Sequence, residues 1–211
     1  KQRFGLLEPG GELIRAMTAD EQRGVARTSL RVAEAALTLV RDRNHALPLD
    51  PAKDKKILLV GVVPESRKGG DGGFQRLHGL RRRLEGRGFS VDLQRNLLYE
   101  TQGWDSDAPQ QYDRLLFVAI RAPHNPFGPL QFWDDEAQTV WGINAMPKGK
   151  IIVVSLGSPY HADEYFERVD AYINAYSNDE STHEALVKAL LGEIPFTGVS
   201  PVNLRRPVFN L

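Results

Sequence analysis

The chain has 211 residues and a mass of 23.6 kDa, which is the size of one large domain or two small ones. Lys plus Arg and Asp plus Glu both number 27, and this formal net charge of zero argues against a protein that mainly coats nucleic acid or an anionic membrane. No cysteine is present, which excludes disulfide scaffolds, thiolate metal sites and cysteine nucleophiles. No apolar run approaches the roughly 20 residues that a membrane-spanning helix needs.

The first 17 residues are predicted to be a linker or the tail of an upstream domain. A short helix-like fragment is interrupted there by the helix breakers Pro9, Gly10 and Gly11. The chain starts at Lys1 and carries no signal peptide, which is typical of a domain cut from a longer polypeptide.

A helix is predicted to begin at Thr18, because Thr18 and Glu21 have the spacing of a capping box. One face of this helix repeats at steps of four, three and four residues: Ala26, Leu30, Ala33 and Leu37. The segment LTLVRD that follows contains two β-branched residues and predicts a short extended run.

The rest of the chain alternates between strand-like and helix-like segments. Strands are predicted over residues 57–63, 89–93, 115–120, 151–156 and 171–176, and helices over 74–84, 134–145, 163–168 and 181–191. This alternation predicts an α/β three-layer sandwich of the flavodoxin-like kind, in which a mostly parallel sheet of five or six strands carries helices on both faces. The final 16 residues have no helical period and are expected to run extended along the surface.

A glycine-rich loop, KGGDGG, follows the first predicted strand. Glycines allow close approach to a phosphate, and the helix that follows could offer its amino-terminal N–H groups to an anion. The loop nevertheless has neither of the phosphate-binding spacings, GxGxxG and GxxxxGK[ST], so a plain loop is favoured. The alternative is a free-standing flavodoxin-like module that binds a phosphate-bearing ligand with this loop and the neighbouring arginines.

Serine and histidine chemistry has weaker support in the sequence. Ser155 and Ser158 end a predicted strand near His161, but the nucleophile pattern GxSxG is absent and a turn explains them better. The five histidines lack HxxxH or HExxH spacing, so no metal site is expected. Among them His124 is the most notable, because it lies in the loop RAPHNPFGP after a buried strand.

Charge and aromatic residues are distributed unevenly. Residues 67–95 hold eight basic and three acidic residues, whereas residues 163–184 hold seven acidic residues and one arginine. Two solvated helix faces are favoured over a basic face that docks on an acidic partner. Trp133 precedes the helix predicted at 134–145 and Trp141 lies within it, and their spacing predicts that at least one of them is in the core.

Several strings resemble the carboxy-terminal α/β sandwich domain of glycoside hydrolase family 3. RVAEAALTLVRDRNHALPLDPAKDKKILLVG (31–61) is similar to the start of that domain, and SPYHADEYFERVDAYINAYSNDESTHEALVKALLGEIPFTGVSPVNL (158–204) is similar to its end. RFGLLEPGG (3–11) resembles the exit from the preceding barrel. The resemblance implies a linker at 1–17 and the domain proper at 18–211.

The same resemblance implies that the catalytic (β/α)8 barrel lies upstream, so that no catalytic residue is expected in this chain. In the β-glucosidase branch the second domain lends a glutamate from a loop, but the corresponding loop here, 121–132, contains no carboxylate. Asp134, Asp135 and Glu136 follow it and are explained by helix capping. The resemblance therefore indicates the β-N-acetylglucosaminidase branch, whose parent enzymes release β-linked N-acetylglucosamine from peptidoglycan or chitin fragments.

The expected partners are the upstream barrel and its amino-sugar substrate, with no cofactor and no metal. Four residues in strand-end loops are expected to border the substrate cleft: Arg67, Asp71, His124 and Asn125. The loops 64–73 and 121–132 are expected to face the barrel, although Phe127 and Phe132 could instead fold back over the sheet. Both an exported and a cytoplasmic location in a bacterium fit the sequence.

Overall fold

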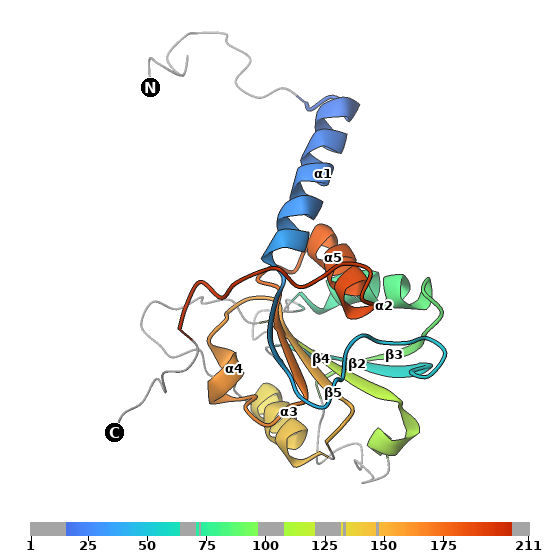
Figure 1. Cartoon of the computed structure of the whole chain (residues 1–211), viewed down its shortest axis with the longest axis vertical. Coiled ribbons are helices and arrows are strands. Elements are labelled where there is room, and N and C mark those ends of the chain that lie inside the picture. Colours follow the sequence, from blue (N-terminus) through green and yellow to red (C-terminus); the bar gives the residue numbers. More distant parts are fainter. Residues whose placement is uncertain are drawn as a thin grey trace.

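The computed structural model of the chain describes residues 16–63, 71, 73–96, 108–120, 132, 134–146 and 148–203. These residues form one six-stranded sheet with the strand order β1-β6-β5-β4-β2-β3 (Figure 1). The strands are β1 (Thr38–Asp42), β2 (Lys56–Val62), β3 (Ser90–Arg95), β4 (Arg114–Ala119), β5 (Ile151–Ser155) and β6 (Ala171–Asn174). Strands β2 to β6 are parallel to their neighbours, and β1 pairs antiparallel with β6 at the edge.

Helices cover both faces of this sheet, which confirms the α/β sandwich (Figure 1). One face carries α1 (Ala19–Ala36), α2 (Leu77–Glu85) and α5 (Glu180–Leu190), and the other carries α3 (Asp134–Ala145) and α4 (His161–Glu164). Two short 3₁₀ segments complete the described elements: η2 (Phe74–Arg76) and η3 (Ala108–Gln111). No helix among the described residues combines the length and apolar character needed to cross a membrane.

The central strands are apolar on both sides because each side packs against a layer of helices. In β4, Leu116 and Val118 contribute to the core beneath α2 and α5, whereas Leu115 and Phe117 contribute to the core beneath α3. All four side chains are fully buried. The uninterrupted apolar runs that predicted the strands thus reflect two separate cores.

Helix α1 begins with the predicted capping box. Thr18 Oγ1 accepts a hydrogen bond from the Glu21 backbone N–H at 3.2 Å, and Glu21 Oε2 accepts one from the Thr18 N–H at 2.9 Å. Only the last turns of α1 pack on α5, and the rest of the helix projects beyond the sheet (Figure 1). Ala33 is its one buried residue.

The predicted helix at 163–168 is wrong in position, because α4 ends at Glu164. Carbonyls beyond it accept hydrogen bonds from β1 and the residue after it instead of continuing the helix: Arg41 Nη1 donates to Phe166 O at 2.7 Å, and Arg43 Nη1 donates to Glu167 O at 2.9 Å. The described part of the tail, 195–203, has neither helix nor strand, as expected. It is joined to the end of α1 by the Gly198 N–H, which donates to Leu37 O at 2.9 Å.

Candidate functional site

The carboxyl ends of the parallel strands form the edge where this kind of fold receives ligands and partners. Residues 71 and 73, after β2, and residues 175–179, after β6, lie at this edge. Thr38 of β1 pairs with Asn174 of β6 in antiparallel register, so α1, which leads into β1, reaches the same edge. The order of the strands thus brings three distant segments of the chain together.

Asp71 is the one residue of the predicted cleft border that lies among the described residues. Its Oδ1 accepts a hydrogen bond from the Gly73 N–H at 2.8 Å, and its Oδ2 accepts one from the Gln75 N–H at 3.1 Å. These backbone hydrogen bonds, that from Gly73 first, lower the pKa of the Asp71 carboxyl group below its usual range. The carboxylate therefore stays ionised and caps η2. Arg67, His124 and Asn125 lie outside the described residues, so the cleft border remains a prediction.

The same capping occupies the amides that a phosphate would need. Besides the two bonds to the Asp71 side chain, the Phe74 N–H donates to Asp71 O at 3.0 Å and the Arg76 N–H donates to Gly73 O at 3.2 Å. The N–H groups of residues 73–76 are thus all bonded within the chain. A carboxylate already holds the position that an anion would take, which argues against the phosphate-binding alternative.

Asn178 links this capped turn to the first turn of α5. Its Nδ2 donates to Gly73 O at 3.2 Å, and its Oδ1 lies 2.9 Å from Nε2 of His183. Since the Asn178 oxygen can only accept, His183 carries its proton on Nε2. Arg76 Nη1 also donates to Asn178 O at 2.7 Å. The loop after β2 is therefore positioned by the loop after β6.

His183 is fully buried, and burial lowers the pKa of its imidazole to about 4. Arg83 and Arg76 act in the same direction, whereas Glu180 and Asp179 oppose it. The ring is consequently neutral near pH 7, which suits its hydrogen bond to Asn178.

Asp179 caps α5 in the way that Asp71 caps η2. Its Oδ1 accepts from the Thr182 N–H at 2.8 Å, and its Oδ2 accepts from Ser177 Oγ at 2.6 Å. Burial alone would raise the pKa of Asp179, but these hydrogen bonds outweigh it and hold the pKa below its usual range. Asp71 and Asp179, two carboxylates at this edge, are thus both engaged in capping.

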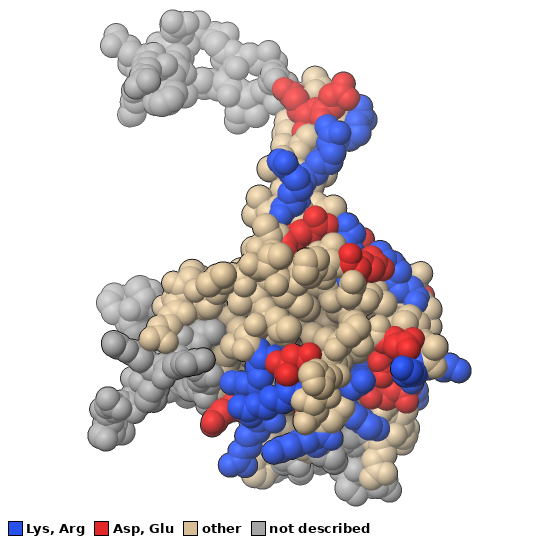
Figure 2. All heavy atoms as spheres, viewed as in Figure 1, with Lys and Arg blue, Asp and Glu red and all other residues tan. Residues whose placement is uncertain are grey.

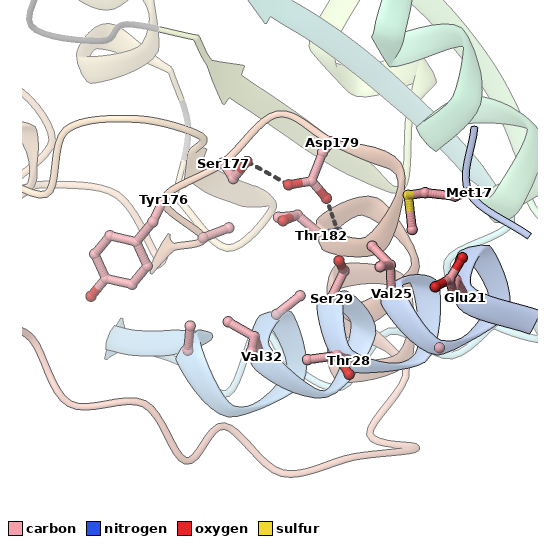
Figure 3. A pocket seen from close by; sticks show the side chains of 14 residues that line it. Met17, Glu21, Val25, Thr28, Ser29, Val32, Tyr176, Ser177, Asp179 and Thr182 are labelled. Carbon is pink, nitrogen blue, oxygen red and sulfur yellow. Dashed lines mark hydrogen bonds between the residues drawn. The ribbon is translucent and has the colours of Figure 1, made fainter. Parts of the chain in front are cut away.

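An apolar groove of about 900 Å³ lies beside this network, between α1 and the segment from β6 to α5. Figure 3 shows Val25, Ser29 and Val32 of α1 facing Ser177 and Thr182 across it. The complete lining is Met17, Glu21, Gly24, Val25, Thr28, Ser29, Val32, Ala33, Ala36, Ala175, Tyr176, Ser177, Asp179 and Thr182. Its walls are mostly aliphatic or small, so the groove suits an apolar surface better than a charged ligand.

The serines considered as nucleophiles have structural roles. Ser155 is fully buried, and its Oγ donates to Ser158 O at 2.7 Å. Ser158 Oγ accepts from the Tyr160 N–H at 3.3 Å. His161 is also fully buried and packs against Phe132, with 4.7 Å between the ring centroids. This agrees with a turn that closes β5.

The structure adds one feature to the helix predicted after the proline-rich loop. Glu136, for which capping was expected, is buried, and the capping itself stays a prediction because the residue before the helix lies outside the described residues. Glu136 shares a helical face with Val140 and Ile143, four and seven residues later, and that face packs on the sheet. Trp141 lies on the opposite side with 69% of its surface exposed. Trp133 and Phe127 lie outside the described residues.

The two oppositely charged regions meet within the domain: their side chains stay partly exposed, in keeping with two solvated helix faces, but the two faces also pair with each other. Arg83 of α2 binds Glu180 and Glu184 of α5, and Arg87 binds Glu184 and Glu193. These pairs form because α2 and α5 pack side by side on the sheet. Figure 2 shows positive and negative side chains interleaved along this side of the molecule.

The sequence prediction missed Asn178, His183 and the groove. A capping signal for α5 was present, since Asp179 precedes Thr182 by three residues. The groove also had a signal, because Val25 and Val32 repeat at a helical spacing on a face of α1 that the predicted core did not use. Among the described residues, no three His, Asp or Glu side chains are grouped in a way that could hold a metal ion.

No family model matches the chain, and no curated protein matches it. Several solved structures do match the chain. A beta-glucoside phosphorylase, BglX, is 26% identical over 93% of this chain with a TM-score of 0.68, and the match covers 34% of that protein. A glycoside hydrolase family 3 beta-N-acetylglucosaminidase from Paenibacillus sp. str. FPU-7 is 22% identical over 93% of this chain with a TM-score of 0.60, and the match covers 35% of it.

The chain has the fold of a family 3 glycoside hydrolase domain. A beta-glucosidase from Listeria innocua shares it at 21% identity and a TM-score of 0.57, over 84% of this chain and 26% of that one. The chain thus spans about a third or less of each neighbour's length. It therefore corresponds in fold to one part of these longer proteins.

Proposed function

We propose that this chain is the non-catalytic carboxy-terminal domain of a family 3 glycoside hydrolase whose parent releases terminal β-linked N-acetylglucosamine from peptidoglycan or chitin fragments. Its partner is an upstream (β/α)8 barrel in the same polypeptide, which carries the catalytic groups and binds the amino sugar. Arg67, Asp71, His124 and Asn125 would border the cleft between the two domains.

The non-catalytic assignment rests on one observation: the described carboxylates considered for catalysis are engaged in hydrogen bonds or buried. A retaining glycosidase needs two catalytic groups about 5–5.5 Å apart, astride the scissile bond. At the carboxyl edge, Asp71 and Asp179 are each engaged by two hydrogen bonds in capping, with a lowered pKa that disfavours a general acid. Glu136 is buried in α3, and the loop 121–132 contains no carboxylate.

The test is an assay of the 211-residue chain and of the same chain joined to its upstream coding region. The short chain should leave a chromogenic β-N-acetylglucosaminide intact, and the longer polypeptide should hydrolyse it. Turnover by the short chain would contradict the non-catalytic assignment.

A second candidate parent acts on β-glucosides. It is favoured by the 26% identity to a beta-glucoside phosphorylase. Chromogenic β-glucoside and β-N-acetylglucosaminide should therefore be compared on the longer polypeptide, each with and without inorganic phosphate. A preference for the glucoside would favour this second parent, and a rate that depends on phosphate would identify a phosphorylase.

A further inference from the structure

Helix α1 carries an apolar face that the described residues of the domain leave exposed. Leu30 and Ala33 point toward α5 and its core, but Met17, Val25 and Val32 lie on another side and are 46%, 54% and 62% exposed. Val25 and Val32 are seven residues apart and lie on one side of the helix, and Met17, just before the N-cap Thr18, lines the same groove, so the three form one apolar stripe. Exposed aliphatic side chains that gather in this way commonly mark an interaction surface.

The stripe forms one wall of the groove between α1 and the segment 175–182, and the opposite wall offers few free polar groups. Asp179 and Ser177 are bonded to each other and to α5, and Tyr176 Oη lies 2.9 Å from Thr38 Oγ1. Ala175 is buried beside them. A partner that enters the groove therefore meets an opposite wall on which the side chains of Tyr176, Ser177 and Asp179 are already bonded, and aliphatic side chains would suit this wall.

We infer that this groove is the docking surface for the domain that precedes α1 in the longer polypeptide, and this inference rests on the proposed function. The neighbouring structures are about three times as long as this chain, which leaves a large body to be placed against it. A preceding domain is tethered to the start of α1 through the predicted linker 1–17, close to Met17, where the stripe begins. This tether raises its effective concentration at the groove, which favours it over a separate partner.

The docking surface proposed here differs from the two strand-end loops that the sequence suggested. It consists of the stripe Met17, Val25 and Val32 together with Ala175 and Tyr176. The Asp71–Asn178–His183 network lies next to it, since Ser177 and Asp179 line the groove and Asn178 stands between them in the chain. A domain seated on α1 would thus also lie close to the loop after β2.

Thiol labelling tests the proposal, because the 211-residue chain has no cysteine of its own. Val32→Cys places a thiol of nearly the same size in the groove, and Arg31→Cys places the matched control on the adjacent, exposed position of α1. Labelling at each position is followed by peptide mass spectrometry, so cysteines in the upstream domain do not interfere. Circular dichroism checks that both variants fold. If Val32→Cys does not fold, Val25→Cys is used in its place.

In the 211-residue chain both thiols should react at similar rates. In the longer polypeptide, Val32→Cys should react at least about tenfold more slowly than Arg31→Cys, because the reagent must wait for the docked domain to open. Equal rates in the longer polypeptide would overturn the proposal. Protection that already occurs in the 211-residue chain and increases with its concentration would also overturn it, since a second copy would then be the occupant.

Failure of the proposed function gives a different result. If the upstream region covers Val32→Cys but hydrolyses neither sugar, the docking surface stands and the glycosidase parent is wrong. If the longer polypeptide hydrolyses the sugar while Val32→Cys stays reactive, the parent stands and the docking surface is wrong.

Discussion

His183 shows how a single buried side chain makes the stability of this domain depend on pH. The pKa of its imidazole is lowered to about 4 by burial, whereas the ordinary value is 6.5. Between these values the unfolded chain binds a proton that the folded chain does not, so protonation favours unfolding. The contribution is fully favourable above pH 6.5 and is lost as the pH falls toward 4.

This residue should account for a loss of about 2 kcal/mol in the free energy of unfolding between pH 7.5 and pH 5. His183→Gln removes the titrating ring and should flatten that part of the pH profile, as measured by urea unfolding at both pH values. Val187→Ala, a buried change in the same helix, should lower stability equally at both and keep the slope of the wild type. An unchanged slope in His183→Gln would show that other groups cause it.

Two glycines with opposite surroundings provide a second residue-scale test. A Cβ at Gly198 would clash with Ala36 O and lie 2.6 Å from Thr38 Oγ1, whereas a Cβ at Gly24 would meet nothing within 4 Å. Gly198→Ala should therefore lower the free energy of unfolding by about 1–3 kcal/mol. Gly24→Ala should raise the helix content of α1 and add at most about 1 kcal/mol. Urea unfolding and circular dichroism measure both, and equal effects would contradict the close approach at Gly198.

At the scale of elements, α2 and α5 are joined across the surface by ion pairs as well as by their shared core. Arg83 Nε lies 3.2 Å from Glu184 Oε2, and Arg87 Nη2 lies 3.5 Å from Glu184 Oε1. The hydrogen bond from Arg83 also lowers the pKa of Glu180. Leu80 and Leu186 are buried in one core beneath the two helices, so the ion pairs add to an interface that apolar packing has already formed.

Arg83→Gln should accordingly cost about 0.5–1 kcal/mol, and the loss should shrink at high salt because the pairs are partly exposed. Arg81→Gln is the matched control, since Arg81 pairs with Glu85 within α2 at 2.8 Å and joins no second element. Its cost should be about 0.3–0.5 kcal/mol. Urea unfolding of both variants at low and high salt measures the difference. A larger cost for Arg81→Gln would contradict the role of the interhelical pairs.

At the scale of the whole molecule, stability is concentrated in the sheet and declines along α1. Every residue of β5 is buried, whereas none of residues 19–29 is. Amides of β5 should exchange with deuterium only on global unfolding, and those of residues 19–29 should exchange at least about 100-fold faster. Mass spectrometry of peptides from the isolated chain measures both. Helix α5, which is buried against the sheet, serves as the helical control, and α1 protected as strongly as α5 would contradict this view.

Features that depend on neighbours within a few residues could be predicted from the amino-acid sequence. The capping box of Thr18 and Glu21 and the apolar runs of β2, β4 and β5 were predicted with nearly correct positions. The alternation of these runs with helices was enough for the sandwich. Asp71 was placed correctly at a strand-end loop, although its capping of Gly73 and Gln75 was not foreseen.

The tertiary structure alone decided which distant residues meet. Asn178 bonds to Gly73 across 105 positions, and Arg83 bonds to Glu184 across 101, because the strand order places β2 and β6 in one sheet with α2 and α5 side by side above it. No local pattern encodes such a contact. The burial of Glu136 and the exposure of the apolar stripe on α1 likewise depend on which helix faces pack against the rest of the domain. Packing decides this, and the periodicity of the sequence does not.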